Sequence, residues 1–233
     1  MYALIIAGGR GERLRPLTDT VPKAMVPVNG QPLLAYQVEW LRREGVTDVL
    51  FLCGYLGEKI RDYFGEGSDY GIEAHYSFET TPLGRGGAVK QGFDLVESDE
   101  RFVLVTNGDI LTNQPISELI ELHQRRGAMA TMMLTPYPSQ FGVVDVSEEG
   151  EIRSFVEKGM LPMWINAGVY VFDRDIEERL PNQGDHEQTT FPALAEEGRL
   201  AGLRSSAKWM AVDGPKDLTE STKALAQGLI SFN

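Results

Sequence analysis

Short apolar runs and amphipathic segments alternate through the first half of the chain. The apolar runs are rich in strand-forming residues and short enough to be buried strands. They are Ala3–Ala7, Asp48–Cys53, Glu73–Ser77 and Phe102–Thr106. Two helices are predicted between or after them, with apolar stripes formed by Leu34, Val38 and Leu41, and by Ile116, Leu119, Ile120 and His123. This alternation predicts an open, mainly parallel sheet covered by helices on both faces.

The second half of the chain has a different pattern. Val143–Val146, Ile152–Val156 and Gly168–Phe172 read as strands separated by short turns. That spacing favours hairpins, and we expect a small antiparallel extension beside the parallel sheet. A closing helix is predicted from the stripe Leu218, Thr222, Leu225 and Leu229. Because no linker or internal repeat interrupts the pattern, we expect a single domain of residues 1–233.

Composition narrows the class of protein. The 233 residues are 42% hydrophobic, which is enough for a sizeable core, and the formal net charge is -12. Such a charge repels a phosphate backbone and argues against a nucleic-acid partner. Cys53 is the only cysteine, so an intramolecular disulfide and a cysteine metal cluster are excluded, as expected for the cytoplasm. No stretch approaches the length of a membrane span, so we expect no membrane partner.

A glycine-rich loop directly follows the first predicted strand. It reads Gly8-Gly9-Arg10-Gly11-Glu12-Arg13-Leu14-Arg15-Pro16-Leu17-Thr18. Glycines let backbone N–H groups approach a phosphate, and the arginines together with Lys23 supply cations that the acidic chain otherwise lacks. The third glycine of the dinucleotide fingerprint is replaced by Leu14, and no Gly-Lys-Ser/Thr of a P-loop follows. The loop therefore indicates a phosphate site of another kind.

The segment from Leu4 to Leu34 resembles the signature of sugar-1-phosphate nucleotidyltransferases, down to Pro22-Lys23 and Pro27-Val28. The resemblance continues in order through nearly the whole chain and is closest to enzymes acting on mannose or heptose 1-phosphate. It implies a three-layer α/β/α Rossmann-like fold with a mixed, mainly parallel sheet. It also implies that residues 1–135 form a nucleotide-binding half and residues 136–233 a sugar-phosphate half with a closing helix.

The resemblance implies roles for individual residues. Arg13 and Lys23 would be catalytic, holding the triphosphate and stabilising charge at the α-phosphorus. The nucleotide would contact Ala7, Gly8, Gly9, Gly11, Glu79, Pro82, Gly84, Gly87 and Asn107. Glu12 and Arg85 depart from the family pattern, which has a small hydroxyl residue and a threonine at these positions.

Glu79 bears on the identity of the base. Relatives that read uracil or thymine tend to carry glutamine there, which offers a donor and an acceptor. A carboxylate offers acceptors only, and these suit the adjacent N1–H and N2–H₂ donors of guanine. The sequence therefore favours GTP as the nucleotide.

A carboxylate follows the strand Val103-Leu104-Val105-Thr106-Asn107, at the end of a sheet where ligands bind. The resemblance makes this residue, Asp109, a ligand of Mg²⁺, a cation that prefers oxygen. The usual second ligand position holds Ala211 in Trp209-Met210-Ala211-Val212-Asp213. Since side chains two apart in an extended segment face the same way, we take Asp213 as the second metal ligand.

Three further segments resemble the family's sugar-phosphate pocket. The match implies that Glu157 and Asn166 bind sugar hydroxyls and that Lys158 grips the acceptor phosphate. It adds Gly142, which would allow a close approach of the sugar ring, and Gly168. The segment Asp185–Pro192 resembles the family's glutamate-containing helix start before Phe-Pro and is expected to be mainly structural.

The sequence therefore predicts an enzyme that joins a sugar 1-phosphate, mannose- or heptose-like, to GTP with Mg²⁺ and releases pyrophosphate. Uridylyl, thymidylyl or cytidylyl transfer remains an alternative, the last with choline phosphate as acceptor, although no aromatic cage for choline is evident. A catalytically silent paralogue that binds nucleotide-sugars is the other alternative. The sequence leaves open whether the protein forms a homo-oligomer.

Overall fold

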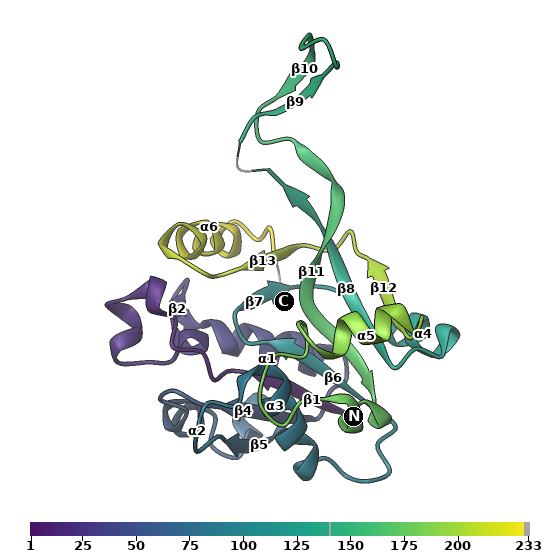
Figure 1. The fold of residues 1–233 in the computed structure, drawn as a ribbon. Helices are drawn as coiled ribbons and strands as arrows, with labels where there is room; N and C mark the ends of the chain where they lie inside the picture. The colour runs from purple at the N-terminus through teal and green to yellow at the C-terminus, as the bar shows by residue number, and fades with distance from the viewer. Residues whose placement is uncertain (140, 231–233) are drawn as a thin grey trace.

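A mixed sheet organises the computed structural model, which describes residues 1–139 and 141–230 (Figure 1). Its seven strands lie in the order β12-β8-β11-β6-β1-β4-β5. They are β1 (Tyr2–Ile6), β4 (Asp48–Cys53), β5 (Glu73–Phe78), β6 (Phe102–Asn107), β8 (Ala130–Pro138), β11 (Met160–Asp173) and β12 (Leu200–Arg204). The pairs of β1 with β4 and β6, of β4 with β5 and of β8 with β12 are parallel, whereas β11 runs antiparallel to β6 and β8.

Helices cover both faces of the sheet. They are α1 (Leu33–Arg43), α2 (Glu58–Phe64), α3 (Gly84–Gly92), α4 (Ile116–Arg126), α5 (Thr190–Glu196) and α6 (Pro215–Ala226). Along β1, alternate side chains enter different cores, because successive residues of a strand point to opposite faces. Ala3 and Ile5 pack with residues of α1, α2 and α4, and Leu4 packs with residues of α3 and α5. The molecule thus has the three layers expected of an α/β/α fold.

Two-residue and three-residue strands complete the architecture. They are β2 (Pro27–Val28) paired with β3 (Gln31–Pro32), and β7 (Ile110–Thr112) paired with β13 (Trp209–Ala211).

Among the helices of the described residues, none has both the length and the apolar character that a membrane-spanning helix requires.

The prediction of an antiparallel extension was right for one hairpin and wrong in placing the strand Gly168–Phe172 beside the sheet. Strand β11, which contains this segment, lies inside the main sheet between β6 and β8. The sequence pattern missed β8, the partner that covers its other edge. The helix α6 also ends at Ala226, so Leu229 falls beyond it.

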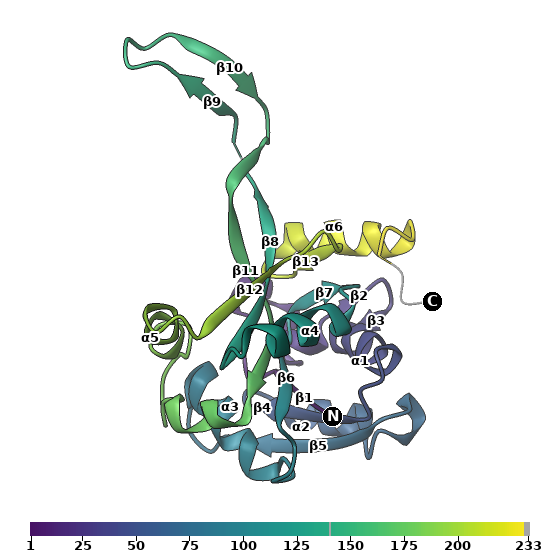
Figure 2. The same cartoon turned by 90° about the vertical axis from the view of Figure 1, so that its right-hand side faces the viewer.

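A hairpin of β9 (Val143–Val146) and β10 (Ile152–Val156) extends from the far ends of β8 and β11. We call residues 141–159 the distal hairpin. Two views at right angles show it projecting away from the body of the molecule (Figures 1 and 2). The two hairpin strands are antiparallel to each other and form a sheet of their own.

Candidate active site

A cavity of about 360 Å³ opens at the carboxyl ends of β1 and β6. It is lined by Ile6, Ala7, Gly8, Gly9, Lys23, Ala24, Leu52, Glu79, Pro82, Gly84, Arg85, Ala88, Asn107, Gly108 and Asp109. Carboxyl ends of parallel strands are the usual place for a ligand in an open α/β sheet. Most of the residues predicted to contact the nucleotide or the metal therefore share one cavity.

Two glycines allow the wall of this cavity to form. A Cβ on Gly54 would lie 2.4 Å from Oε1 of Glu79, and a Cβ on Gly8 would lie 3.3 Å from the same atom. The other carboxylate oxygen of Glu79 accepts a hydrogen bond of 2.9 Å from the backbone N–H of Leu83. The Glu79 carboxylate is thereby fixed as an acceptor on the cavity wall.

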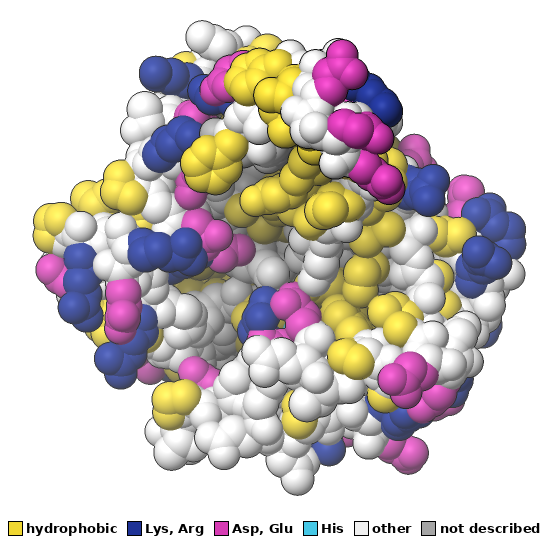
Figure 3. Space-filling view, turned by 45° about the horizontal axis from the view of Figure 1, so that its top comes forward, with side chains coloured by type: hydrophobic (Ala, Val, Ile, Leu, Met, Phe, Trp, Pro, Cys, Tyr) yellow, Lys and Arg dark blue, Asp and Glu magenta, His cyan; other side chains and the backbone are white. Residues whose placement is uncertain are grey.

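The ammonium of Lys23 lies between two carboxylates. Nζ donates to Oδ2 of Asp109 over 2.6 Å and to Oδ1 of Asp213 over 2.5 Å. A guanidinium nitrogen of Arg13 is 3.4 Å from the same oxygen of Asp213. On the face of the molecule shown in Figure 3, acidic and basic side chains likewise meet in a central hollow, with hydrophobic side chains along one side of it. The four residues predicted to handle phosphate charge and metal thus form one cluster.

Strand pairing explains how residues so distant in sequence meet. Ala211, the last residue of β13, pairs with Ile110, the first residue of β7. The next residue, Val212, donates its N–H to the carbonyl oxygen of Asp109 over 2.8 Å. This register carries Asp213 to the neighbourhood of Asp109, whereas Ala211 packs against the hydrophobic core.

Asp217 holds the turn in which Asp213 lies. Its Oδ2 accepts hydrogen bonds from the backbone N–H groups of Asp213, over 3.1 Å, and Gly214, over 2.9 Å. Asp217 is the third residue of α6, and an acidic side chain at this position accepts hydrogen bonds from N–H groups that the helix leaves unpaired at its start. No motif in the sequence indicates this positioning role of Asp217.

The charge cluster shifts the pKa values of its members. Burial alone would lower the pKa of Lys23, but the charge of Asp109 and the hydrogen bonds that Lys23 donates to both carboxylates raise it overall. Burial alone would raise the pKa of Asp213, but the hydrogen bond and charge of Lys23, with the charge of Arg13, lower it overall. Both groups are therefore held in their charged forms near neutral pH.

Gln37 of α1 supports the loop that carries Asp109. The Gln37 side chain is almost fully buried, and its Nε2 donates to the carbonyl oxygens of Asn107, over 2.9 Å, and Ile110, over 2.8 Å. Oδ1 of Asn107 is itself buried and has no hydrogen-bond partner among the described residues. The sequence offered one signal for Gln37, a polar amide within the otherwise apolar stripe of a helix.

A second cluster joins the acceptor-side residues to the cavity. Asn166 Nδ2 donates to the hydroxyl of Tyr170 over 2.9 Å and to Oε1 of Glu187 over 3.0 Å. Glu187 also pairs over 2.9 Å with Arg85, which lines the cavity. Burial alone would lower the pKa of Arg85, but its hydrogen bond to Asp185 and the nearby Glu187 raise it. The segment expected to be mainly structural thus supplies charges beside the candidate acceptor site.

The predicted glycines have different positions. Gly168 has a φ of +74°, and a Cβ there would lie 2.6 Å from Nδ2 of Asn107, so it lies beside the cavity. Gly11 packs on Lys23 and Thr18. Gly87 packs on the carbonyl of Asn182 and does not line the cavity that contains Asp109, so its position indicates a packing role.

The structure does not bring three predicted substrate residues to the cavity. Gly142, Glu157 and Lys158 lie on the distal hairpin, where Glu157 and Lys158 are exposed. A Cβ on Gly142 would meet the side chains of Phe155 and Glu157, both on the same hairpin. The acceptor side is therefore split between the cavity rim and the hairpin.

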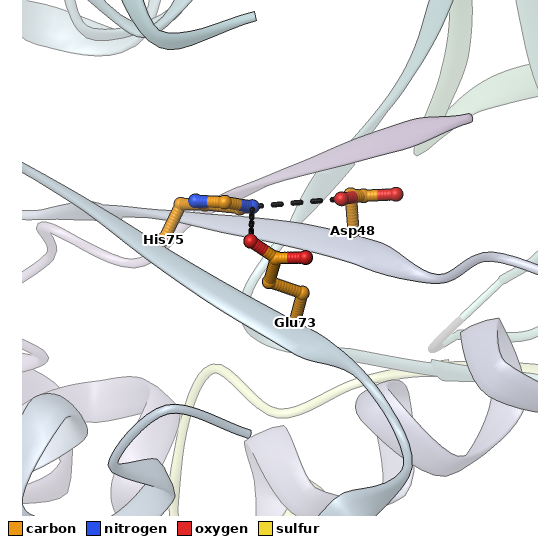
Figure 4. Close-up of side chains that lie close together, drawn as sticks. All are labelled: Asp48, Glu73 and His75. Atoms are coloured by element: carbon orange, nitrogen blue, oxygen red, sulfur yellow. Dashed lines mark ion pairs between the residues drawn. The ribbon is translucent and has the colours of Figure 1, made fainter. Parts of the chain in front are cut away.

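One group of His, Asp and Glu side chains among the described residues is close enough to hold a metal ion, and it lies elsewhere. Asp48, Glu73 and His75 approach one another at the start of β4 and β5 (Figure 4). Nε2 of His75 is 3.6 Å from Asp48 and 3.8 Å from Glu73. Because β4, β5 and β6 are parallel, this group lies at the amino ends of the strands, whereas Asp109 follows the carboxyl end of β6.

A family model described as nucleotidyl transferase matches residues 2–228. The chain belongs to the nucleotidyl transferase family. The family and the α/β fold class predicted from the sequence are thus confirmed.

Relatives with assigned names cover most of this chain. It is 35% identical to mannose-1-phosphate guanyltransferase of Saccharomyces cerevisiae, over 95% of this chain and 64% of that protein. It is 38% identical to the catalytic subunit beta of mannose-1-phosphate guanylyltransferase from Dictyostelium discoideum, over 93% of this chain and 62% of that protein. The chain therefore spans about three-fifths of the length of these curated relatives.

A solved structure shares the fold. A crystal structure of HddC from Yersinia pseudotuberculosis complexed with GMP-PN has a TM-score of 0.75 at 24% identity. The match covers 96% of this chain and 99% of that one.

Proposed function

We propose that this protein transfers the guanylyl group of GTP to a manno-configured sugar 1-phosphate in the cytoplasm and releases pyrophosphate. In this proposal residues 1–233 form a single nucleotidyltransferase domain. The two halves, residues 1–135 and 136–233, share one sheet, and the division between them falls inside β8. The buried, free Cys53 agrees with a reducing compartment.

The observation that carries the proposal is the convergence of Asp109 and Asp213 on one cation beside a glycine-lined cavity. The Lys23 ammonium lies where both carboxylates point, so the position favours a cation. A pair of carboxylates with open surroundings suits Mg²⁺, which keeps waters and binds phosphate oxygens. The residues present therefore fit a magnesium ion, and Mg²⁺ would neutralise charge on the triphosphate there.

The protein's own residues supply the rest of the chemistry. A phosphate oxygen of the sugar 1-phosphate attacks the α-phosphorus of GTP, and the bond from that phosphorus to the β-phosphate bridge oxygen breaks. Lys23 and Arg13, once released from the carboxylates, lie close enough to the cavity to bind the triphosphate and stabilise the charge that develops. The acceptor phosphate is already ionised near neutral pH, so no general base is needed.

Guanine is favoured by Glu79 and by the names of the relatives. The Glu79 carboxylate is an acceptor on the cavity wall, and guanine presents two adjacent donors. Both curated relatives above are named as guanyl- or guanylyltransferases of mannose 1-phosphate, and the HddC crystal contained GMP-PN.

One assay tests the proposal. Purified protein is incubated with Mg²⁺, each of GTP, UTP, dTTP and CTP, and mannose, heptose or glucose 1-phosphate or choline phosphate, and pyrophosphate release is measured. We expect the highest rate with GTP and a manno-configured sugar 1-phosphate. Turnover with another base would overturn the guanine assignment. No turnover with any pair, together with binding of a nucleotide-sugar, would support a silent paralogue instead.

A further inference from the structure

The distal hairpin exposes hydrophobic side chains that no described part of the same chain covers. Val144 pairs with Phe155 and Val146 pairs with Ile152 across the two strands, which places these four side chains on one face. They are between 45% and 64% exposed, and Phe141 at the base of the hairpin is 79% exposed. An isolated two-stranded hairpin is marginally stable in water, and an exposed apolar face of this kind marks an interaction surface.

The same hairpin carries half of the candidate acceptor site. Glu157 and Lys158 directly follow β10, and Gly142 directly precedes β9. Asn166, the acceptor residue tied to the cavity, is nine residues beyond Glu157 along β11. At ~3.3 Å per extended residue, this separation is on the order of 25–30 Å, and both ribbon views show the hairpin leading away from the body (Figures 1 and 2).

The charged side chains of the hairpin suit the active-site cavity, which every copy of this chain carries. Lys158 offers a free ammonium for a phosphate, and Glu157 offers a carboxylate for sugar hydroxyls. The cavity itself has two cations among its lining residues: Lys23, which lies between Asp109 and Asp213, and Arg85, which is already paired with Asp185 and Glu187. In this structure the hairpin lies far from the cavity of its own chain (Figures 1 and 2). In a dimer, the hairpin of each copy can reach the cavity of the other.

We propose that the distal hairpin reaches the active site of a second copy, so that two chains in a symmetric dimer each complete the sugar-phosphate pocket of the other. The face of Val144, Val146, Ile152 and Phe155 packs on the partner, and Glu157 and Lys158 enter the partner's cavity. Reciprocal exchange of an identical element is a low-cost route to a dimer, because both contacts follow from one two-fold axis. This inference rests on the function proposed above for its site assignments.

Complementation between two inactive variants tests the exchange. Asp109→Asn disables the cavity and leaves the hairpin intact, whereas the double variant Glu157→Gln with Lys158→Ala disables the hairpin and leaves the cavity intact. The two are co-expressed with different affinity tags, and dimers that carry both tags are isolated. Each heterodimer contains one site with an intact cavity and an intact hairpin, so we expect about half of the wild-type rate. Each variant alone should show little activity.

A matched control replaces the hairpin variant with Lys23→Ala, a second cavity variant. This heterodimer has no complete site under either arrangement and should remain inactive. If the hairpin instead closes over the cavity of its own chain, neither heterodimer should recover activity. That result would overturn the exchange. Full activity of the hairpin variant alone would overturn it as well.

Sedimentation equilibrium provides a readout that does not depend on turnover. The wild type should be a dimer, and Ile152→Glu should shift it towards monomer, while Glu149→Lys at the turn of the hairpin should not. If the wild type is active but monomeric, the exchange is wrong and the proposed function survives. If the wild type is an inactive dimer that Ile152→Glu dissociates, the proposed function fails and the hairpin interface survives.

Discussion

The backbone N–H of Val212 donates to the carbonyl oxygen of Asp109 over 2.8 Å, joining two segments more than 100 residues apart in the sequence. This bond continues the pairing of β7 with β13 and leaves the next side chain, Asp213, facing the Lys23 ammonium. The register therefore brings Asp213 into the charged cluster, whereas Ala211, two residues earlier, carries no charge and packs against the core.

The first prediction concerns Asp109. Asp109→Asn keeps the size of the side chain but removes one of two charges around Lys23, so we expect kcat to fall by orders of magnitude while the fold survives. Steady-state rates at several Mg²⁺ concentrations and a thermal unfolding curve measure the two effects. Near-normal turnover at limiting Mg²⁺ would remove Asp109 from the metal site.

The second prediction concerns Asp213. Asp213→Ala should raise the Mg²⁺ concentration needed for half-maximal rate and lower kcat, because two carboxylates hold a cation more firmly than one. We expect a smaller loss than at Asp109, since a bridging water can replace one ligand. Asp217→Asn is the matched control: it keeps an acceptor for the N–H groups of Asp213 and Gly214 and should change the Mg²⁺ titration only slightly.

The third prediction concerns the base. Glu79→Gln places an amide donor opposite the donors of guanine, and the mispairing costs roughly 1–3 kcal/mol. The ratio of kcat/KM for GTP to that for UTP should therefore fall. The glutamine oxygen can still accept from the N–H of Leu83, so the loop should keep its position. An unchanged ratio would mean that Glu79 does not read the base.

Much of the fold could be predicted because its strands are locally recognisable. The bounds of β4, β9 and β10 match the predicted runs, since each run is rich in apolar and β-branched residues. Strand β8 was missed because it is defined by its partners: it pairs with β11 and β12, which lie later in the chain. No local pattern indicates that β11 should enter the main sheet.

The candidate site was predictable to a similar degree. Residues of the glycine-rich loop are neighbours in sequence, and the structure places Gly8 and Gly9 at the cavity and Arg13 beside Asp213, so motif spacing was informative. Gln37 and Glu187 act through partners distant in the sequence, and their roles depend on packing that no motif encodes. The position of Lys158 on a projecting hairpin depends on the direction that β8 and β11 take beyond the sheet, which the spacing of residues does not fix.

The fourth prediction concerns Gln37. Gln37→Met keeps the side-chain length but leaves the carbonyl oxygens of Asn107 and Ile110 without their buried donor. Leaving such groups unpaired costs about 1–3 kcal/mol, which urea unfolding should detect. We also expect a lower kcat, because the loop with Asp109 loses its support. A variant as stable and as active as the wild type would contradict this role.

The last prediction uses the buried histidine next to the acceptor cluster. His186 is fully buried among Tyr170, Phe172 and Phe191, and neither ring nitrogen has a hydrogen-bond partner among the described residues. Burial lowers its pKa from 6.5 to about 4, so the folded protein keeps the ring neutral. Between these two values the unfolded chain binds a proton that the folded chain does not.

The sign of the pH dependence follows from this difference. The contribution of the neutral ring is complete above about pH 6.5 and is lost as the pH falls towards 4, a change on the order of 3 kcal/mol in the free energy of unfolding. His186→Phe keeps the aromatic packing and removes the titration. Urea unfolding at pH 7.5 and pH 5 should therefore show a smaller loss of stability for the variant than for the wild type. Equal losses would mean that other groups cause the acid destabilisation and that His186 already binds its proton in the folded state.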